Sequence, residues 1–493
     1  METSELMRLK DELDAFVSEF DDCIKTRPSR GHLRTYMAGL LGPLKRKNVE
    51  AIALEAGAPV RTLQEFLSFH RWDDAAVARQ VRELVRLRHA STDAIGVIDE
   101  TSFAKKGKKT AGVKRQHCGS TGKIDNCVVT VHLGYVADEF HALLDSALFV
   151  PEEWAHDAER CREAGLPEST EHRPKTKIAI DLVRQAVEEG IELRWLTADE
   201  LYGRSAEFRE SVVALGLHYA VEIPRTLTGW TRRPRVEPAG ARPTGGRGGR
   251  PRKHARLAKD APKARPVERL WKRGGPSWHL FRIKDTEKGP EVWRVRETRF
   301  FPWRREGTTG IAGGECRLII AVNVLTEERK YFLTSAPRDI PLKTILGVLF
   351  SRVHIEQVFR EAKDAVGLDH FQVRRHEALR RHLVVTALAV LFLAEQTDRL
   401  RGEKSVVDPV PNPRGRGSTA RPGHGEVGAP APCREDSQPD HVPPTACGRG
   451  GQKSHQTTEA RTSRGRHRPT PRAAMPALSG EAPAANQWGK VAL

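Results

Sequence analysis

Three acidic residues lie where predicted strands and a predicted helix could present them together. Asp99 closes the short apolar run 94–99, Asp199 follows the predicted strand 193–197, and Glu356 lies within the predicted helix 342–365. Carboxylate oxygens are the hard ligands that Mg²⁺ prefers. Two such ions about 3.5–4 Å apart stabilise the attacking and leaving oxygens of an in-line displacement at phosphorus. We therefore expect all three acids to be catalytic metal ligands for two Mg²⁺ ions, with Mn²⁺ as an acceptable substitute.

Each acid also has a simpler interpretation. An acid that follows a strand commonly caps a turn or a helix, and a glutamate on a charged helix commonly faces water. The cations around the three acids favour the chemical interpretation. Arg352 and Lys363 lie on the same predicted helix as Glu356, and Lys105 and Lys106 follow Asp99 in a basic run. We predict that Lys105 and Lys106 bind the phosphate backbone of a nucleic acid.

The elements that would position these residues form an α/β pattern. Residues 91–224 contain predicted strands at 94–99, 127–136, 140–150, 193–197 and 219–223, with helices at 177–189 and 205–215. The order β-β-β-α-β-α-β is that of a ribonuclease-H-like core, whose first and fourth strands lie side by side. That neighbourhood would bring Asp99 and Asp199 together.

Four further segments complete the expected organisation. Residues 1–90 show helical periodicity and are interpreted as a helical, DNA-binding domain. Residues 225–335 are expected to form a β-rich insertion with a basic Gly/Pro-rich loop, and residues 336–402 to form the helix of Glu356 and a closing helix. Residues 403–493 show neither apolar period, so we expect a disordered tail, whose composition also resembles a coding sequence translated out of frame.

The overall charge indicates a polyanionic partner. The chain has 493 residues with 82 Lys+Arg against 64 Asp+Glu, a formal charge of +18. Such an excess favours nucleic acid, because each neutralised phosphate releases counterions; a basic tail without function is the alternative. The seven cysteines form no CxxC pair, the N-terminus has no apolar signal core, and the longest apolar run, 384–394, is too short to span a bilayer. We expect a cytoplasmic protein without a membrane partner.

Several local motifs resemble those of insertion-sequence DDE transposases. Ile98-Asp99-Glu100-Thr101 resembles the first-acid motif and Asp199-Glu200-Leu201-Tyr202-Gly203 the second. Arg352, Glu356 and Lys363 match three members of the Tyr-Arg-Glu-Lys signature of the cut-and-paste branch. Leu349 stands where that signature has its tyrosine, which puts the role of this position in doubt. The resemblance covers roughly residues 35–400 and excludes the tail.

The resemblance implies a function and partners. Members of this family are Mg²⁺-dependent DNA endonucleases and strand transferases that bind the terminal inverted repeats of their element and a target DNA. It also implies a ribonuclease-H-like catalytic domain with a β-rich insertion, a homodimer in the synaptic complex, a place at the nucleoid, and phosphate contacts by Arg352 and Lys363. Two alternatives stay open: an inactive transposase remnant that only binds element DNA, and a ribonuclease-H-like nuclease without strand transfer.

Overall fold

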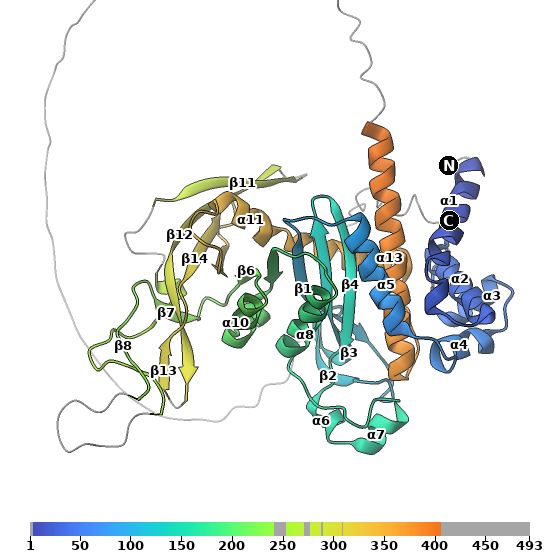
Figure 1. The fold of residues 1–493 in the computed structure, drawn as a ribbon, viewed down its shortest axis with the longest axis horizontal. Coiled ribbons are helices and arrows are strands. Elements are labelled where there is room, and N and C mark those ends of the chain that lie inside the picture. Colours follow the sequence, from blue (N-terminus) through green and yellow to red (C-terminus); the bar gives the residue numbers. More distant parts are fainter. Residues whose placement is uncertain (1–2, 241–252, 271–276, 287–288, 308, 406–493) are drawn as a thin grey trace, which may run out of the picture. The chain divides into compact units, whose positions relative to one another are not determined.

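The computed structural model describes residues 3–405 apart from 241–252, 271–276, 287–288 and 308 (Figure 1). The expected tail beyond residue 405 and residues 241–252 of the basic Gly/Pro-rich loop of the insertion lie outside the described residues. The described part is a mixed α/β fold around one large mixed sheet. None of its helices is both long and apolar enough to cross a membrane.

The N-terminal segment is helical, as the sequence predicts. Polar side chains cap three of its helices: Thr26 accepts from the amide of Ser29, Asn48 from Ala51, and Asp73 from Ala76. Such caps satisfy backbone donors that a helix start leaves free. The helical elements are α1 (Thr3–Ser18), η1 (Asp21–Cys23), α2 (Arg27–Leu41), α3 (Val49–Glu55), α4 (Val60–Ser68) and α5 (Asp74–Arg88).

The central part of the sheet contains both parallel and antiparallel strand pairs. β3 is antiparallel to β1 and to β4, whereas β5 runs parallel to β1, and β6 parallel to β5. The spatial order is therefore β4-β3-β1-β5-β6, and the five strands expected for this region are confirmed. β2, paired with β3, was not expected. The strands are β1 (Ile95–Ala104), β2 (Lys114–Cys118), β3 (Lys123–Ala137), β4 (Phe140–Leu148), β5 (Trp195–Ala198) and β6 (His218–Glu222).

Helices connect these strands. The two predicted helices correspond to α8 and α10, and three short helices flank them. α8 contacts β3 and β4, so it helps to cover the sheet. The helices are α6 (Glu152–Ala155), α7 (Ala158–Glu163), α8 (Lys175–Glu188), α9 (Glu200–Gly203) and α10 (Ala206–Ala214).

The insertion continues the central sheet. β15 pairs antiparallel with β6, and the order runs on through β14, β12, β7 and β10. The elements are β7 (Thr228–Trp230), β8 (Val236–Glu237), β9 (Arg256–Leu257), β10 (Arg265–Pro266), η2 (Val267–Arg269), β11 (His279–Thr286), β12 (Gly289–Glu306), β13 (Thr309–Ala312), β14 (Cys316–Asn323) and β15 (Arg329–Thr334).

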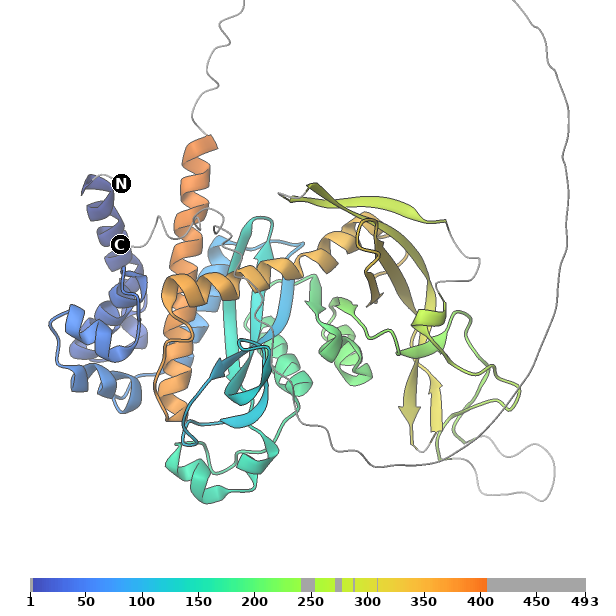
Figure 2. The ribbon, with the colours of Figure 1, turned by 180° about the vertical axis from the view of Figure 1, so that it is seen from behind.

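The C-terminal helices differ from the prediction in one respect. The single helix expected over 342–365 is two helices, α11 (Leu342–Phe350) and α12 (Arg352–Val366). They part at Ser351, whose hydroxyl donates to the carbonyl of Val348 at 2.7 Å. A serine that bonds to the preceding turn competes with the helical ladder. The last helix, α13 (His376–Ser405), corresponds to the expected closing helix (Figure 2).

Buried histidines make the fold sensitive to acid. Burial lowers the pKa of His382 and of His376 to about 4 and that of His132 to about 3. His382 shows why: Nε2 donates to the carbonyl of Leu368 at 3.1 Å, so Nδ1 accepts from the hydroxyl of Tyr36 at 3.0 Å. Protonation of the ring would place a charge in a buried site and would leave the proton of that hydroxyl without its acceptor.

We expect stability to fall as the pH drops from about 6.5 towards 4. Each folded-state pKa lies below the unfolded value, so in this window the unfolded chain binds more protons, at a cost of about 1.4 kcal/mol per pH unit per histidine. Asp99, with its raised pKa, gives a smaller opposite contribution. Urea unfolding at pH 7 and pH 5 tests this. His382→Gln should be less stable at pH 7 but should lose less on acidification; an equal loss would contradict the assignment.

Candidate active site

Asp99 lies in the middle of the sheet, on β1 between β3 and β5. The amide of Glu100 donates to its Oδ1 at 2.8 Å, and the side chain is only 15% exposed. Burial raises the pKa of Asp99 to about 6, against the lowering effect of Arg352; Asp199 and Glu100 raise it further. Asp99 is therefore a buried carboxylate whose charge is only partly compensated.

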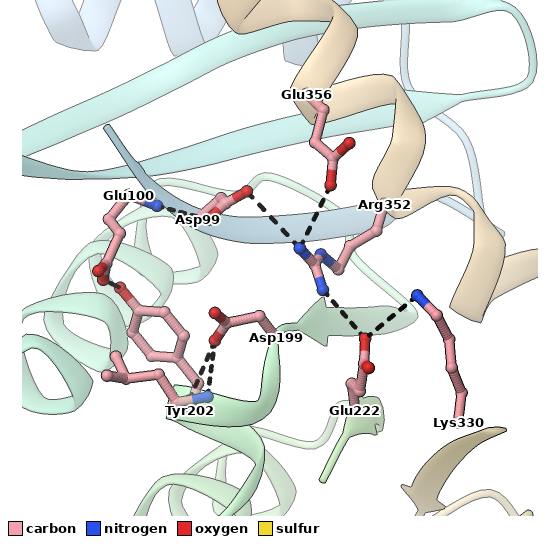
Figure 3. A network of polar contacts seen from close by, with 9 residues as sticks. Asp99, Glu100, Asp199, Tyr202, Glu222, Lys330, Arg352 and Glu356 are labelled. Atoms are coloured by element: carbon pink, nitrogen blue, oxygen red, sulfur yellow. Dashed lines mark hydrogen bonds and ion pairs between the residues drawn. The ribbon is translucent and has the colours of Figure 1, made fainter. Parts of the chain in front are cut away.

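Asp199 follows β5, the strand next to β1. The parallel register aligns Ile98 with Ala198, so Asp99 and Asp199 come directly after aligned residues. Oδ1 of Asp199 accepts from the amides of Leu201 at 2.8 Å and Tyr202 at 3.4 Å, so this acid also caps α9. Its other oxygen lies on the side of Asp99 and Arg352 (Figure 3). The cap fixes the carboxylate without using that oxygen.

α12 brings Glu356 and Arg352 over these acids (Figure 3). Arg352 makes ion pairs with Asp99 at 3.9 Å and with Glu356 at 3.4 Å. The side chain of Glu356 is 55% exposed, and that of Arg352 only 20%. Nε of Arg352 is buried and has no hydrogen-bond partner within the described residues. The guanidinium thus occupies the space between two of the predicted metal ligands and retains an unused donor.

Glu222 is a fourth acid beside these three, and the sequence analysis missed it. The register aligns Ala198 with Val221, so Glu222 is the next neighbour of Asp199. It pairs with Arg352 at 3.4 Å and with Lys330 of β15 at 3.8 Å. Burial raises its pKa, against the effects of Lys330 and Arg352. The sequence contains a pattern that could have identified it, because Glu222 is an acid near the end of the fifth predicted strand.

A second set of contacts ties the first acidic motif to α8 and α9. Glu100 accepts from Lys175 at 2.5 Å and from the hydroxyl of Tyr202 at 3.1 Å. Tyr202 is fully buried. These bonds link the residue after Asp99 to the helix that Asp199 caps, so they restrain both acids. The sequence analysis quoted these residues in motifs but gave them no role.

The other predicted cations lie apart from this cluster. Lys363 is on α12 beyond Glu356, close enough for its charge to add to burial in lowering the pKa of His132. Lys105 donates to the carbonyl of Phe371 at 2.8 Å and lies 3.4 Å from the centre of its ring. Burial lowers its pKa to about 8. Lys106 is exposed. The ammonium of Lys105 therefore already has partners within the protein, whereas Lys106 is exposed to solvent.

The donor set fits a hard divalent cation. Asp99, Asp199 and Glu356 supply only carboxylate oxygens. Burial, which is the main cause of the raised pKa of Asp99, disfavours its charged form more than Arg352 favours it. Within the described residues, however, no three potential ligands are already grouped as a metal site requires. Glu356 turns towards Arg352 instead. A cavity of about 170 Å³ between Glu222, Lys330, Arg352 and Glu356 gives room for several water molecules.

Gly203 sets the distance between α9 and β6. A Cβ atom at this position would overlap the backbone carbonyl oxygen of Glu222 far inside van der Waals contact. Gly203→Ala must therefore push α9, and Asp199 with it, away from the sheet. We expect a loss of about 1–3 kcal/mol in unfolding free energy and at least about a tenfold loss of activity.

The matched control for Gly203→Ala is Gly347→Ala. Gly347 lies within α11, where a Cβ would meet nothing within 4 Å, so alanine should be neutral or slightly stabilising. Thermal melts and activity assays of both variants check the prediction. A fully active Gly203→Ala would show that the close approach of α9 does not position Asp199.

The chain is similar to known proteins in three comparisons. The family model described as DDE superfamily endonuclease matches residues 19–290, more than half of the chain. A "Probable transposase for insertion sequence element IS701" from Microchaete diplosiphon is 33% identical over 187 residues. That match covers 38% of this chain and 46% of the relative, a little under half of its length. A piggyBac transposase, solved as a synaptic complex with hairpin DNA, is similar with 8% identity and a TM-score of 0.39, over 78% of this chain and 69% of that one.

Proposed function

This chain belongs to the DDE superfamily endonucleases, and from that premise we propose that it is a transposase that cleaves DNA at the ends of an insertion sequence and joins them to a target. The observation that carries the proposal is the alignment of Asp99 and Asp199 on neighbouring parallel strands, with Glu356 approaching from α12. The name of the relative that is 33% identical supports it. The strand order β4-β3-β1-β5-β6, with its directions, supports a ribonuclease-H-like core.

The three acids would hold divalent metal, as the family generally does. Two Mg²⁺ ions, or Mn²⁺ in their place, would supply charge for the attacking and leaving oxygens at phosphorus. Asp199 is held ready by its bonds to α9, and Asp99 by the amide of Glu100. Glu356, the most exposed of the three, is the ligand that must reorient, since its present partner is Arg352.

Arg352 and Lys363 would bind the DNA strand at the cleaved phosphate. The unpartnered Nε of Arg352 is a donor that a phosphate oxygen would satisfy. Glu222 and Lys330 would restrain the same guanidinium from the opposite side. Lys106, which is exposed, remains a candidate for backbone contact. Lys105 would first have to leave the carbonyl and ring of Phe371, so we rank it below Lys106 as a candidate for contact with DNA.

The remaining segments have proposed roles in the same reaction. Residues 1–90 would bind the element end, 91–224 and 336–402 would build the catalytic core, and 225–335 would extend it along the DNA. Because an element has two ends, two copies of the chain would act together in a synaptic complex.

The test is a reaction on paired duplexes that carry the element's own terminal repeats, with a plasmid target. Metal-dependent cleavage followed by insertion of the 3′-hydroxyl ends into the plasmid is the expected result. Cleavage without joining would assign a nuclease that only hydrolyses. Specific binding without cleavage in Mg²⁺ and in Mn²⁺ would assign an inactive remnant.

A further inference from the structure

α3 and α4 are joined by a tight turn that fixes their relative direction. The amide of Ala58 donates to the carbonyl of Ala53 at 2.9 Å, and the amide of Gly57 to that of Leu54 at 3.2 Å. This pair of bonds is a Schellman turn, which needs a left-handed residue, and Gly57 has φ of 61°. Four residues, 56–59, thus separate the helices. Two short helices joined by such a glycine turn are the form of a helix-turn-helix.

α2 completes a three-helix unit with them. It contacts both α3 and α4, and Gly39 of α2 lies so close to Ile52 of α3 that a Cβ there would overlap that side chain. Ala53, at the centre of the unit, is fully buried, as are Leu63 and Phe66 of α4. The inner face of α4 is therefore used for packing, and only its outer face can meet a partner.

The outer face of α4 carries side chains of the types that can read base edges. Arg61, Gln64, Glu65 and Ser68 recur at helical spacing, so they form one stripe. Arg61 is 89% exposed, and its ion pair with Glu65 at 2.8 Å is a weak surface contact that a partner can displace. Arginine recognises guanine, glutamine recognises adenine, and glutamate accepts from cytosine in the major groove. The stripe borders a groove of about 420 Å³.

α4 is also held rigidly from behind. Arg381 of α13 is buried and donates to the carbonyls of Leu67 at 3.1 Å, His70 at 2.7 Å and Trp72 at 3.0 Å. These carbonyls belong to the end of α4 and the segment after it, so the helix is fixed to the long helix that follows the candidate site. A helix that reads a sequence needs such a fixed position, because base contacts tolerate little displacement.

The charges around α4 match a phosphate backbone. Lys45 and Arg46 are exposed just before α3, and Arg71 is exposed just after α4. Basic residues at both ends of a helix-turn-helix can contact the phosphates of the two DNA strands that border a groove.

We propose that α4 is a recognition helix, which enters the major groove of duplex DNA and reads its sequence through Arg61 and Gln64. Lys45 and Arg46 contribute phosphate contacts that carry no sequence information. The identification of that duplex as the end of an insertion sequence rests on the proposed function; the readout by α4 does not.

The experiment selects DNA by binding, in the absence of metal. The full chain, with EDTA present, is used to enrich a pool of duplexes with a randomised core, and the affinity for the selected duplex is compared with that for a scrambled one. Arg61→Ala and Gln64→Ala should each lose roughly 5- to 150-fold for the selected duplex and little for the scrambled one. The selected sequence should relax at one or two adjacent base pairs.

Two controls separate base reading from charge. Lys45→Ala should weaken binding to both duplexes and reduce the slope of log affinity against log salt by about 1. Arg184→Ala removes an arginine from α8 that is 40% exposed and should leave the selected sequence unchanged. Unaltered thermal melting of all four variants excludes misfolding as a cause.

Three results would overturn the recognition helix. The pool could yield no preferred sequence, the α4 variants could select the same sequence with the same affinity, or they could lose self-association instead, which would assign the face to a second copy. A failure of the proposed function looks different: the preferred sequence would persist, while duplexes carrying it would not be cleaved in Mg²⁺ or Mn²⁺.

Discussion

Asp99→Asn is expected to reduce metal-dependent DNA cleavage by about a thousandfold or more while DNA binding stays within about twofold of the wild type. The amide removes one proposed anionic metal ligand from the middle of the cluster, and Asp199 and Glu356 alone cannot replace its charge. The cations proposed to bind phosphate are untouched. Glu356→Gln and Asp199→Asn should behave in the same way, although Asp199→Asn also alters a helix cap.

Stability distinguishes loss of a ligand from loss of the fold. The pKa of Asp99 is raised to about 6, so at pH 7 the folded protein bears a cost for ionising this carboxylate. Asparagine removes that cost, and Arg352 keeps Glu222 and Glu356 as partners. We expect an unfolding midpoint in EDTA equal to or above that of the wild type. The rise in midpoint that Mn²⁺ produces in the wild type should be largely lost.

The matched control is Asp93→Asn. Asp93 precedes β1 by two residues, its side chain is 70% exposed, and its ion pair with Arg194 lies at the surface. This variant should cleave normally. Full cleavage by Asp99→Asn would remove Asp99 from the metal site, and an equal defect in Asp93→Asn would point to a general effect of lost charge.

Much of the site could be predicted because it depends on local patterns. β5 is a short apolar run that ends just before Asp199, as predicted, and the order of the strands in the chain suggests which of them are neighbours. The expected end of the first strand at Asp99 is wrong, because β1 continues to Ala104 through its pairing with β3. The aligned register of β1, β5 and β6 then places Glu222 beside them. Glu222 was not predicted because the pattern used to identify candidate ligands was an acid that follows a strand, whereas Glu222 is the last residue of its strand.

What could not be predicted depends on contacts between distant residues. The insertion joins the central sheet through pairing of residues 332–334 with 220–222, which no local periodicity encodes. Lys105 belongs to a run that looks solvated, yet Phe371 covers it from far along the chain. Likewise, helical spacing places Arg352 and Glu356 on one face but does not reveal that Asp99 and Glu222 draw the guanidinium inward.

Arg352→Ala is expected to have two large effects that separate in the presence of metal. In EDTA, at pH 7.5, the variant should lose about 1–3 kcal/mol of unfolding free energy, because Asp99 and Glu222 are mostly buried and each loses a cationic partner. Added Mn²⁺ should recover more stability than in the wild type, since the ion replaces a charge that no longer competes with it.

Cleavage by Arg352→Ala should nevertheless stay low, about a hundredfold or more below the wild type, since the metal cannot take over the contact to phosphate. The salt slope of the engaged complex should fall by about 1. Arg360→Ala, which removes an exposed arginine from the same helix, is the control and should keep its stability in EDTA. If Arg352→Ala matched that control in stability and cleavage, the guanidinium would be a surface charge; if it lost stability alone, Arg352 would only neutralise the carboxylates.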